Sequence, residues 1–244
     1  MTRDRRTTWV EVCTSTNDLA WKAALEGAPH GSAFFADEQS MGRGRRGRSW
    51  IAPRGSALLG SIVLRPEIEA GRAQLVTALG ALAVTDLARN LSLETRVRFP
   101  NDVFAGGRKL AGVLAESRFV GDRPDVFILG IGLNVNAHPP DLSATSLSAE
   151  LGRDLDRISL ARQLLESVDA WAARLAGPLA PWQIAWRERS DLVGRTVEVR
   201  IAEREIRGIV EDLDPIEGLV LRIPTGHLRV VRGEEVERLR PATS

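Results

Sequence analysis

The sequence of 244 residues predicts an α+β fold: a mixed, largely antiparallel sheet with helices, followed by a small C-terminal β-barrel. Three observations favour this class. Strand-like and helix-like segments alternate at the start of the chain, four strand-like segments crowd into residues 94–135, and roughly the last fifty residues hold only short strands. Strands that follow one another closely are typical of antiparallel sheets, because short turns can join them.

The N-terminal part begins with a β-rich segment and a helix. Residues 14–18 offer several N-cap side chains, and the helix continues through residues 19–25 until Gly27 and Pro29 end it. The strands expected here cover residues 7–12, 32–37 and 56–64. A second helix is predicted over residues 73–91 from its apolar periodicity and its Ala and Leu content.

The middle of the chain is dense in strands and ends in helices. Strands are predicted over residues 94–99, 102–105, 109–118 and 126–135, and helices over residues 158–175 and 181–189. Gly106-Gly107 separates two of these strands, and Gly121 to Pro124 separates two others. Such turns are typical of hairpins.

The predicted elements change near residue 190 from long helices and strands to short, closely spaced strands. This change predicts two domains, at residues 1–190 and 191–240. The second contains short strands at residues 196–201, 205–213, 218–223 and 227–232. Closely spaced strands in so short a segment indicate a small barrel. Residues 241–244 are expected to be frayed.

Composition excludes several classes of protein. The formal net charge of +1 disfavours a general nucleic-acid binder, which would carry a basic excess. Cys13 is the single cysteine, and the three histidines are far apart, so neither an internal disulfide nor a zinc site is expected. We find no signal peptide and no apolar stretch long enough for a membrane span, and we therefore predict a cytoplasmic protein.

Residues 42–50, Gly-Arg-Gly-Arg-Arg-Gly-Arg-Ser-Trp, form the most informative segment. Glycines let backbone N–H groups approach a ligand, and arginines bind carboxylate and phosphate oxygens. The spacing also matches a dinucleotide fingerprint, but that motif requires a following helix, whereas Pro53 and Gly55 lead here into a strand. We interpret the segment as an anion-binding loop rather than a solvated basic loop.

Three further segments are weak when each is taken alone. Residues 98–102 (Arg-Phe-Pro-Asn-Asp) fit a turn that ends a strand. Residues 108–116 place Lys109 at the head of a strand that contains a glycine, and a hairpin-end lysine in solvent would also explain it. Residues 130–136 (Gly-Ile-Gly-Leu-Asn-Val-Asn) place two glycines in an apolar strand. Such glycines weaken a strand unless another group lies against it.

Taken together and in order, these segments resemble the biotin–protein ligases. The resemblance spans essentially the whole chain, and the Gly-Arg loop with Lys-Leu-Ala-Gly at residues 109–112 is its most specific part. It implies a catalytic domain like that of class II synthetases at residues 1–190, which binds biotin and ATP, and an SH3-like barrel at residues 191–240. The chain begins close to the catalytic segments, so we expect the type without an N-terminal DNA-binding domain and no DNA-binding role.

The resemblance implies a reaction in two steps. Biotin and Mg-ATP form biotinyl-5′-adenylate and pyrophosphate, and the biotinyl group then passes to a lysine of a biotin carboxyl carrier domain. ATP and Mg²⁺ are the implied cofactors, with Mg²⁺ carried by ATP and Asp102 as a candidate ligand. The expected protein is a monomer or a weak homodimer, and its loop at residues 40–49 is expected to be mobile until ligands order it.

The resemblance also implies roles for individual residues. The catalytic residues would be Lys109, Arg45 and Arg43. Biotin would be bound by Ser15, Thr16, Asn17, Gln39, Gly42, Arg43, Gly44, Arg45, Lys109 and Gly112. ATP and the adenylate would be bound by Arg45, Arg46, Arg48, Trp50, Asn101, Asp102 and Asn134.

One departure from the family pattern keeps alternatives open. Arg98-Phe99 stands where the family usually has Lys-Trp before Pro-Asn-Asp. Arginine keeps the positive charge, but its planar guanidinium places hydrogen-bond donors differently from the ammonium group of lysine. This departure suggests a catalytically weak relative that retains biotin or nucleotide as one alternative. A lipoate–protein ligase-like acyl ligase, which has a related fold, is the other, and the Gly-Arg loop and Lys-Leu-Ala-Gly argue against it. A nucleic-acid binder that uses the arginine loop is disfavoured by the near-zero net charge.

Overall fold

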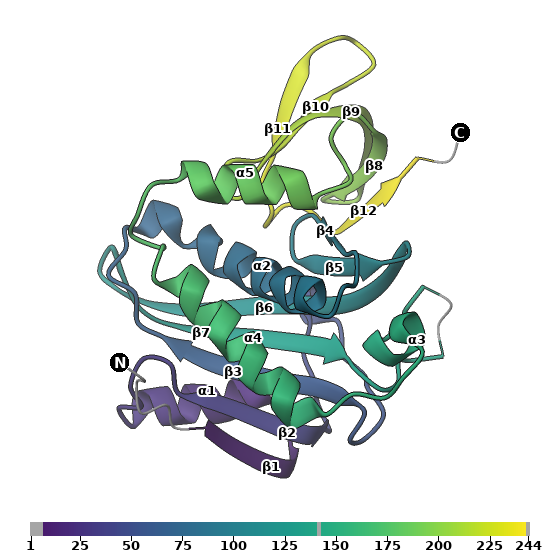
Figure 1. Ribbon diagram of the computed structural model, residues 1–244. Helices are drawn as coiled ribbons and strands as arrows, with labels where there is room; N and C mark the ends of the chain where they lie inside the picture. Colours follow the sequence, from purple (N-terminus) through teal and green to yellow (C-terminus); the bar gives the residue numbers. More distant parts are fainter. Residues whose placement is uncertain (1–6, 141–142, 243–244) are drawn as a thin grey trace.

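A seven-stranded sheet forms the centre of the protein in this computed structural model, which describes residues 7–140 and 143–242 (Figure 1). Its strand order is β1-β2-β3-β7-β6-β5-β4. The strands are β1 (Thr7–Cys13), β2 (Ala33–Gln39), β3 (Ala57–Leu64), β4 (Arg96–Arg98), β5 (Asp102–Ala105), β6 (Arg108–Val120) and β7 (Arg123–Asn134). β1 and β2 pair in parallel and the other neighbours pair antiparallel, so the predicted mixed, largely antiparallel sheet is confirmed.

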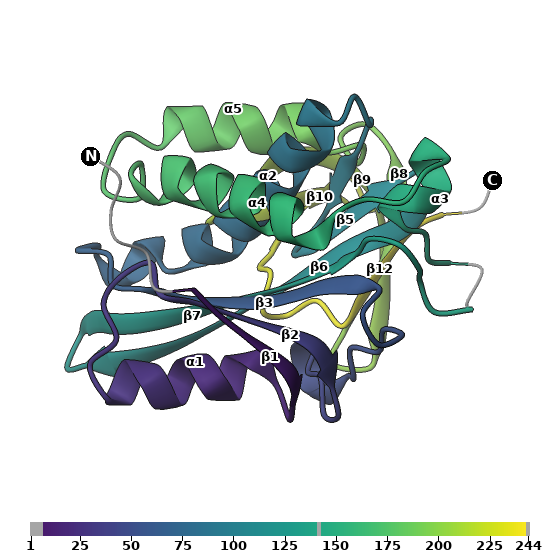
Figure 2. The same ribbon diagram turned by 60° about the horizontal axis from the view of Figure 1, so that its bottom comes forward.

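Helices cover both faces of this sheet (Figure 2). α1 (Thr16–Leu25) lies on one face, and α2 (Gln74–Asn90) and α4 (Arg157–Ala172) lie on the other. α2 is apolar around most of its circumference and is buried from Leu75 to Ala88 except at two positions. That pattern fits a helix enclosed between the sheet and another helix, and it explains why its periodicity was strong in the sequence.

The C-terminal strands form a separate five-stranded antiparallel sheet, which matches the predicted small SH3-like barrel. Its order is β11-β10-β9-β8-β12. The strands are β8 (Thr196–Ile201), β9 (Arg204–Asp214), β10 (Gly218–Arg222), β11 (Leu228–Val231) and β12 (Arg238–Pro241). α5 (Ala180–Arg189) connects the two sheets and packs against β9. Where the chain divides into domains stays a prediction.

Two elements depart from the sequence-based expectations. Pro241 was expected to be frayed, which is wrong: it ends β12, which pairs with β8, whereas residues 243–244 lie outside the described residues. An edge strand accepts proline because one side of its backbone needs no partner. The short helix α3 (Leu147–Leu151) was not predicted, although Ser146 caps its start and Gly152 ends it at φ 70°.

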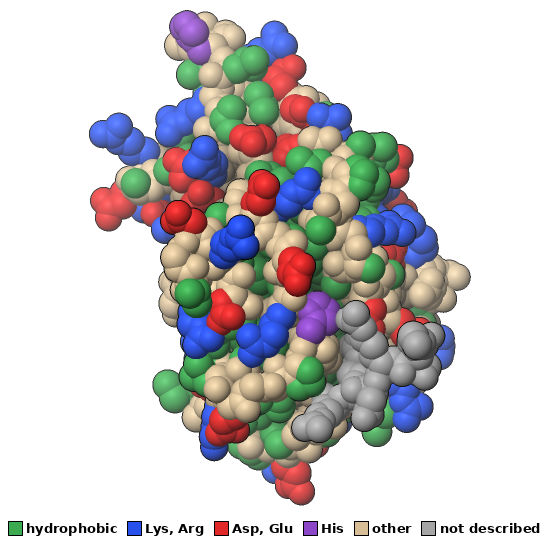
Figure 3. Space-filling view, turned by 90° about the vertical axis from the view of Figure 1, so that its left-hand side faces the viewer, with side chains coloured by type: hydrophobic (Ala, Val, Ile, Leu, Met, Phe, Trp, Pro, Cys, Tyr) green, Lys and Arg blue, Asp and Glu red, His purple; other side chains and the backbone are tan. Residues whose placement is uncertain are grey.

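Charges of both signs share the surface. Figure 3 shows Lys and Arg side chains interspersed with Asp and Glu on the face it displays, without a continuous basic region. The near balance of 33 basic and 32 acidic residues predicts such a mixture. Within the described residues, every helix is too short or too polar to cross a bilayer.

Candidate active site

A cavity of about 200 Å³ lies where the start of α1, the middle of β6 and β7, the loop at residues 42–50 and residues 236–239 meet. It brings together most of the predicted site residues. Those that line it are Ser15, Thr16, Asn17, Gln39, Arg43, Gly44, Arg45, Arg46, Arg48, Trp50, Asn101, Asp102, Lys109 and Gly112. Gly42 and Asn134 do not line it.

Uncharged polar groups make one wall of the cavity. Ser15 caps α1, which places Thr16 and Asn17 in the first turn, and all three residues are buried. Gln39 Oε1 accepts hydrogen bonds from Thr16 N (2.7 Å) and Thr16 Oγ1 (3.1 Å). Asn17 Nδ2 is buried without a hydrogen-bond partner. A buried amide donor of this kind is available to a polar ligand, because leaving it unpaired costs free energy.

Ser61 of β3 also supports this wall and was missed at the sequence level. Its Oγ lies 2.6 Å from Asn17 Oδ1 and 2.7 Å from Thr16 Oγ1. The sequence offers only a serine in an otherwise apolar strand, which was a weak signal.

The arginine loop is a tight hairpin-like excursion and not the start of a helix. Trp50 N donates to Gly42 O (2.9 Å), and Gly44 N donates to Arg48 O (2.7 Å). A single 3₁₀ turn occupies Arg45–Gly47, and the chain then enters β3. Since no helix follows the glycines, the dinucleotide interpretation is excluded on geometry as well. A Cβ on Gly42 would lie 2.4 Å from Trp50 O, so Gly42 shapes the loop instead of lining the cavity.

The Trp50 ring lies so close to β6 and β7 that it explains why these strands carry glycines. A Cβ on Gly132 would lie 2.4 Å from Trp50 Cε2, and one on Gly112 would lie 3.0 Å from Trp50 Cζ3. A Cβ on Gly130 would lie 2.4 Å from Asn17 Oδ1. The prediction that another group lies against these strands is therefore confirmed, and in this structure the group is protein.

Lys109, Asp102, Asn101 and Arg45 form the charged end of the cavity. Lys109 Nζ lies 2.8 Å from Asp102 Oδ1 and 5.5 Å from the centre of the Trp50 ring. Arg45 donates to Asn101 Oδ1 (3.2 Å), whose amide in turn donates to Val113 O (2.8 Å). Lys109 and Arg45 are thus held by two consecutive residues, Asp102 and Asn101, and cations held in this way suit an anionic ligand.

Arg98 and Phe99, the departure from the family pattern, also line the cavity. The Arg98 guanidinium carbon lies 3.7 Å from the centre of the Phe104 ring, and its NH2 lies 3.8 Å from Asp191 Oδ2. Burial holds the pKa of Arg98 below its ordinary value. Phe99 is 5% exposed and packs under Gly233.

Asn134 lies apart from the cavity. It is buried, and its Nδ2 donates to Thr145 O (2.9 Å), while its Oδ1 has no hydrogen-bond partner. Its expected contact with the nucleotide stays a prediction that this geometry does not support directly.

Three loop arginines contact the C-terminal part of the chain. Arg45 donates to Gly233 O, Arg46 to Glu234 O (2.6 Å) and Glu235 O (3.1 Å), and Arg48 to Glu237 O. Sequence analysis did not anticipate this contact, because residues 233–237 lie some two hundred positions away and carry no motif. The contact brings the barrel into the wall of the cavity.

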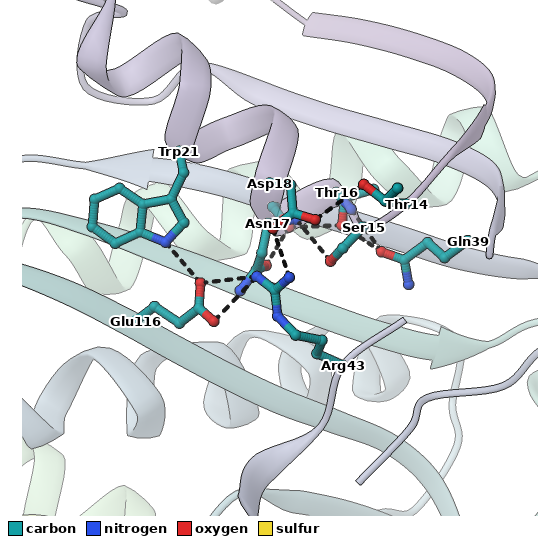
Figure 4. Close-up of polar contacts among 10 residues, drawn as sticks. Thr14, Ser15, Thr16, Asn17, Asp18, Trp21, Gln39, Arg43 and Glu116 are labelled. Carbon is teal, nitrogen blue, oxygen red and sulfur yellow. Dashed lines mark hydrogen bonds and ion pairs between the residues drawn. The ribbon is translucent and has the colours of Figure 1, made fainter. Parts of the chain in front are cut away.

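Arg43 instead points toward Asp18 and Glu116 (Figure 4). Its NH1 donates to Asp18 Oδ1 (2.6 Å), and its NH2 lies 3.3 Å from Glu116 Oε1. Asp18 and Glu116 were not among the predicted site residues, since one acid in a helix and one in a strand carry no local signal.

The two arginines differ in electrostatics. The hydrogen bond to Asp18 raises the pKa of Arg43, and attraction to Glu116 adds to the shift. Burial lowers the pKa of Arg45 below its ordinary value, although the charge of Asp102 partly offsets the effect. A partly buried cation whose hydrogen bonds go to neutral acceptors favours an incoming anion.

Candidate metal ligands are sparse at this site. Among residues 7–140 and 143–242, no group of three or more His, Cys, Asp or Glu side chains could hold a metal ion. Asp102 faces the cavity, but its carboxylate is paired with Lys109.

Known proteins resemble this chain in sequence over most of its length. Residues 9–134 match the model of the biotin/lipoate A/B protein ligase family. A biotin–[acetyl-CoA-carboxylase] ligase of Paracoccus denitrificans is 35% identical over 234 residues, which cover 91% of this chain and 96% of that protein. One from Mycobacterium tuberculosis is 34% identical over 236 residues, 93% of this chain and 86% of that protein.

The fold has a close counterpart among solved structures. The biotin protein ligase from Aquifex aeolicus in complex with biotin and ATP superposes with a TM-score of 0.80 at 24% identity, over 97% of this chain and 99% of that one. The conserved order of elements, the loop at the cavity and the extent of both sequence matches lead to one assignment: the chain belongs to the biotin/lipoate A/B protein ligase family and, within it, to the biotin–protein ligases.

Proposed function

We propose that this protein activates biotin with ATP and transfers it to a lysine of a biotin carboxyl carrier domain. In the first step a biotin carboxylate oxygen attacks the α-phosphorus of ATP, and pyrophosphate leaves. In the second step the lysine amine of the carrier attacks the acyl carbon of biotinyl-5′-adenylate, and AMP leaves with the bonding electron pair. The family to which the chain belongs supports this reaction.

The observation that carries the proposal is the polarity of the cavity. One end presents the uncharged wall of Thr16, Asn17 and Gln39, and the other presents the cations Arg45 and Lys109, with Lys109 next to Asp102. A ligand with a polar uncharged ring and a carboxylate, which must meet a phosphate, matches this arrangement. Bringing two anions together requires fixed positive charge, and such preorganised charge is a large part of catalysis.

The roles follow the geometry of the cavity. Ser15, Thr16, Asn17 and Gln39 bind the ring of biotin, while Gly42 and Gly44 give the loop its shape. Lys109 and Arg45 hold the carboxylate and the α-phosphate, and Gly112 gives Trp50 room beside them. The adenylate side is formed by Arg46, Arg48, Trp50, Asn101 and Asp102.

The donor set fits ATP better than a free metal ion. The cavity offers guanidinium and ammonium groups to phosphates, whereas Asp102 is the carboxylate at its charged end and already contacts Lys109 at 2.8 Å. We therefore infer that Asp102 is the residue that would contact Mg²⁺ brought to the site with ATP. When bound, Mg²⁺ neutralises charge on the phosphates.

We also propose a separate role for each part of the chain. Residues 1–190 form the catalytic domain, and residues 191–240 form a barrel that supplies one wall of the cavity through residues 236–239. The partner is the carrier domain of a biotin-dependent carboxylase, and the ligase works as a monomer or a weak homodimer.

The test measures both steps in the same protein. Pyrophosphate release on addition of biotin and ATP reports adenylate formation, and labelling of a biotin carrier domain reports transfer. We expect release with biotin and not with lipoate; the opposite preference would replace the proposal by a lipoate ligase, and no release would indicate a non-catalytic relative.

Lys109→Ala is expected to reduce adenylate formation by about 100-fold, because it removes a fixed charge at the reacting centre. The chain contains only one other lysine, Lys22, which is exposed in the last turn of α1 and gives the matched control Lys22→Ala. Equal rates for the two variants would remove Lys109 from the proposed centre.

A further inference from the structure

Arg43 differs from the other loop arginines in what holds it. Its guanidinium bridges two carboxylates on two different elements, Asp18 of α1 and Glu116 of β6. Arg45, Arg46 and Arg48 instead donate to backbone carbonyls of residues 233–237. The positive charge of Arg43 is therefore largely compensated before any ligand arrives.

The two carboxylates are themselves held by other residues. Thr14 Oγ1 donates to Asp18 Oδ2 (3.0 Å), which leaves Oδ1 for Arg43. Trp21 Nε1 donates to Glu116 Oε2 (2.7 Å), and Arg43 approaches the other oxygen of that carboxylate (Figure 4). Neither anchor depends on the loop, so α1 and β6 present a preformed pair of acceptors on which the loop can dock.

Asp18 and Glu116 lie next to residues that line the cavity. Asp18 directly follows Thr16 and Asn17, which line the cavity, and Glu116 follows Leu114, which also lines it. Arg43 therefore reaches from the loop to α1 and to β6 beside the uncharged wall. A loop fixed at this point closes the side of the cavity that receives the ring of biotin.

We propose that Asp18 and Glu116 are positioning residues that act through Arg43 to hold the loop as the outer wall of the biotin subsite. The inference rests on the proposed function, since it assigns that end of the cavity to biotin. It also moves Arg43 from the anion-binding group to the wall, because two carboxylates oppose the approach of a phosphate or a carboxylate to it.

The side chains involved are partly exposed, at 44% for Asp18, 28% for Glu116 and 40% for Arg43. Ion pairs at such exposure are individually weak. Their removal should therefore affect how long the loop stays closed rather than whether the protein folds. We expect the double variant Asp18→Asn, Glu116→Gln to raise KM for biotin and the rate of adenylate release about tenfold, with kcat for adenylate formation within about twofold.

The experiment compares wild type, the double variant and Asp18→Glu, which keeps a carboxylate at position 18. Asp125→Asn is the matched control, because it removes a carboxylate from the neighbouring strand β7 that pairs with Arg118 of β6, away from the cavity. Thermal denaturation of all four proteins is measured first. KM and kcat for biotin, release of biotinyl-5′-adenylate and tryptic cleavage between residues 43 and 48 are then recorded.

Support consists of a raised biotin KM, faster adenylate release and faster loop cleavage in the double variant, a smaller change in Asp18→Glu and no change in Asp125→Asn. An unchanged KM and cleavage rate, or a fall in kcat at constant KM, would overturn the proposal. Failure of the proposed function is distinguishable, because wild type would then form no adenylate, whereas loop cleavage without ligand still compares wild type with the variants.

Discussion

The two sides of the loop at residues 42–50 are built differently. On the side of α1, Arg43 is paired with two carboxylates, and its pKa is raised, first by the hydrogen bond to Asp18. On the side of the barrel, Arg45 meets an amide and a backbone carbonyl, and burial lowers its pKa. The same residue type therefore serves as an anchor in one place and, in the other, as a cation whose hydrogen bonds go to neutral acceptors.

This difference in partners indicates which arginines can bind an anionic substrate. A phosphate near Arg43 would have to displace or approach two carboxylates, at a Coulombic cost. A phosphate near Arg45 or Arg48 replaces neutral carbonyl acceptors by a charged one, which strengthens the hydrogen bonds. Binding of ATP is thus expected to exchange contacts with residues 233–237 for contacts with phosphate.

The largest expected effect is at Arg45. Arg45→Ala should lower kcat/KM for ATP by about 100-fold, because it removes a preorganised donor from the reacting centre. Arg43→Ala should act mainly on KM for biotin. Steady-state pyrophosphate release with each substrate varied in turn measures both. If the two variants lose the same factor for both substrates, the comparison between the two sides of the loop fails.

An intermediate effect is expected from Gly132→Ala. The new methyl group would lie 2.4 Å from Trp50 Cε2, and the indole ring would have to move. Overpacking of this kind costs about 1–3 kcal/mol in the free energy of unfolding, which chemical denaturation measures. The displaced ring should also weaken adenylate binding on the barrel side.

Gly71→Ala provides its control. No heavy atom lies within 4 Å of a Cβ at this position, so the free energy of unfolding should change by less than about 0.5 kcal/mol. A Gly132→Ala protein as stable as wild type, with unchanged tryptophan fluorescence, would show that Trp50 does not press on β7.

The smallest expected effect concerns Glu237, whose carboxylate lies 3.6 Å from both Arg46 and Arg200. Glu237→Gln keeps the backbone carbonyl that Arg48 contacts and removes only the charge. We expect a loss below about 1 kcal/mol in stability, decreasing with added salt. A large loss in denaturation experiments would indicate that side-chain charge, and not the backbone, ties the loop to the barrel.

Much of the fold could be predicted because the local sequence patterns favour the same helices and strands that pack in the tertiary structure. The apolar run of α2 and the close strands β4 to β7 were expected from periodicity and turn residues. β12 and α3 were not predicted, because β12 forms through pairing with the distant strand β8 and α3 is too short, at five residues, to show a helical period. Strand boundaries also shifted, since the extended hairpin of β6 and β7 is set by pairing between strands.

For the site, the sequence by itself determined the chemistry of the loop and several other residues that line the same cavity. Glycines and arginines at residues 42–48, Lys109 and the Asn101-Asp102 pair are informative as residue types, whatever surrounds them. They led to the family and to the kind of substrate.

Only the tertiary structure decided how the loop's charges are used. Asp18, Glu116 and the carbonyls of residues 233–237 carry no motif, and they reach the loop because α1, β6 and the barrel converge there. The strength of a charge depends on burial and on nearby ions, which are properties of three-dimensional neighbours. For that reason the sequence could list the arginines, whereas the fold separated the anchor from the anion-binding ones.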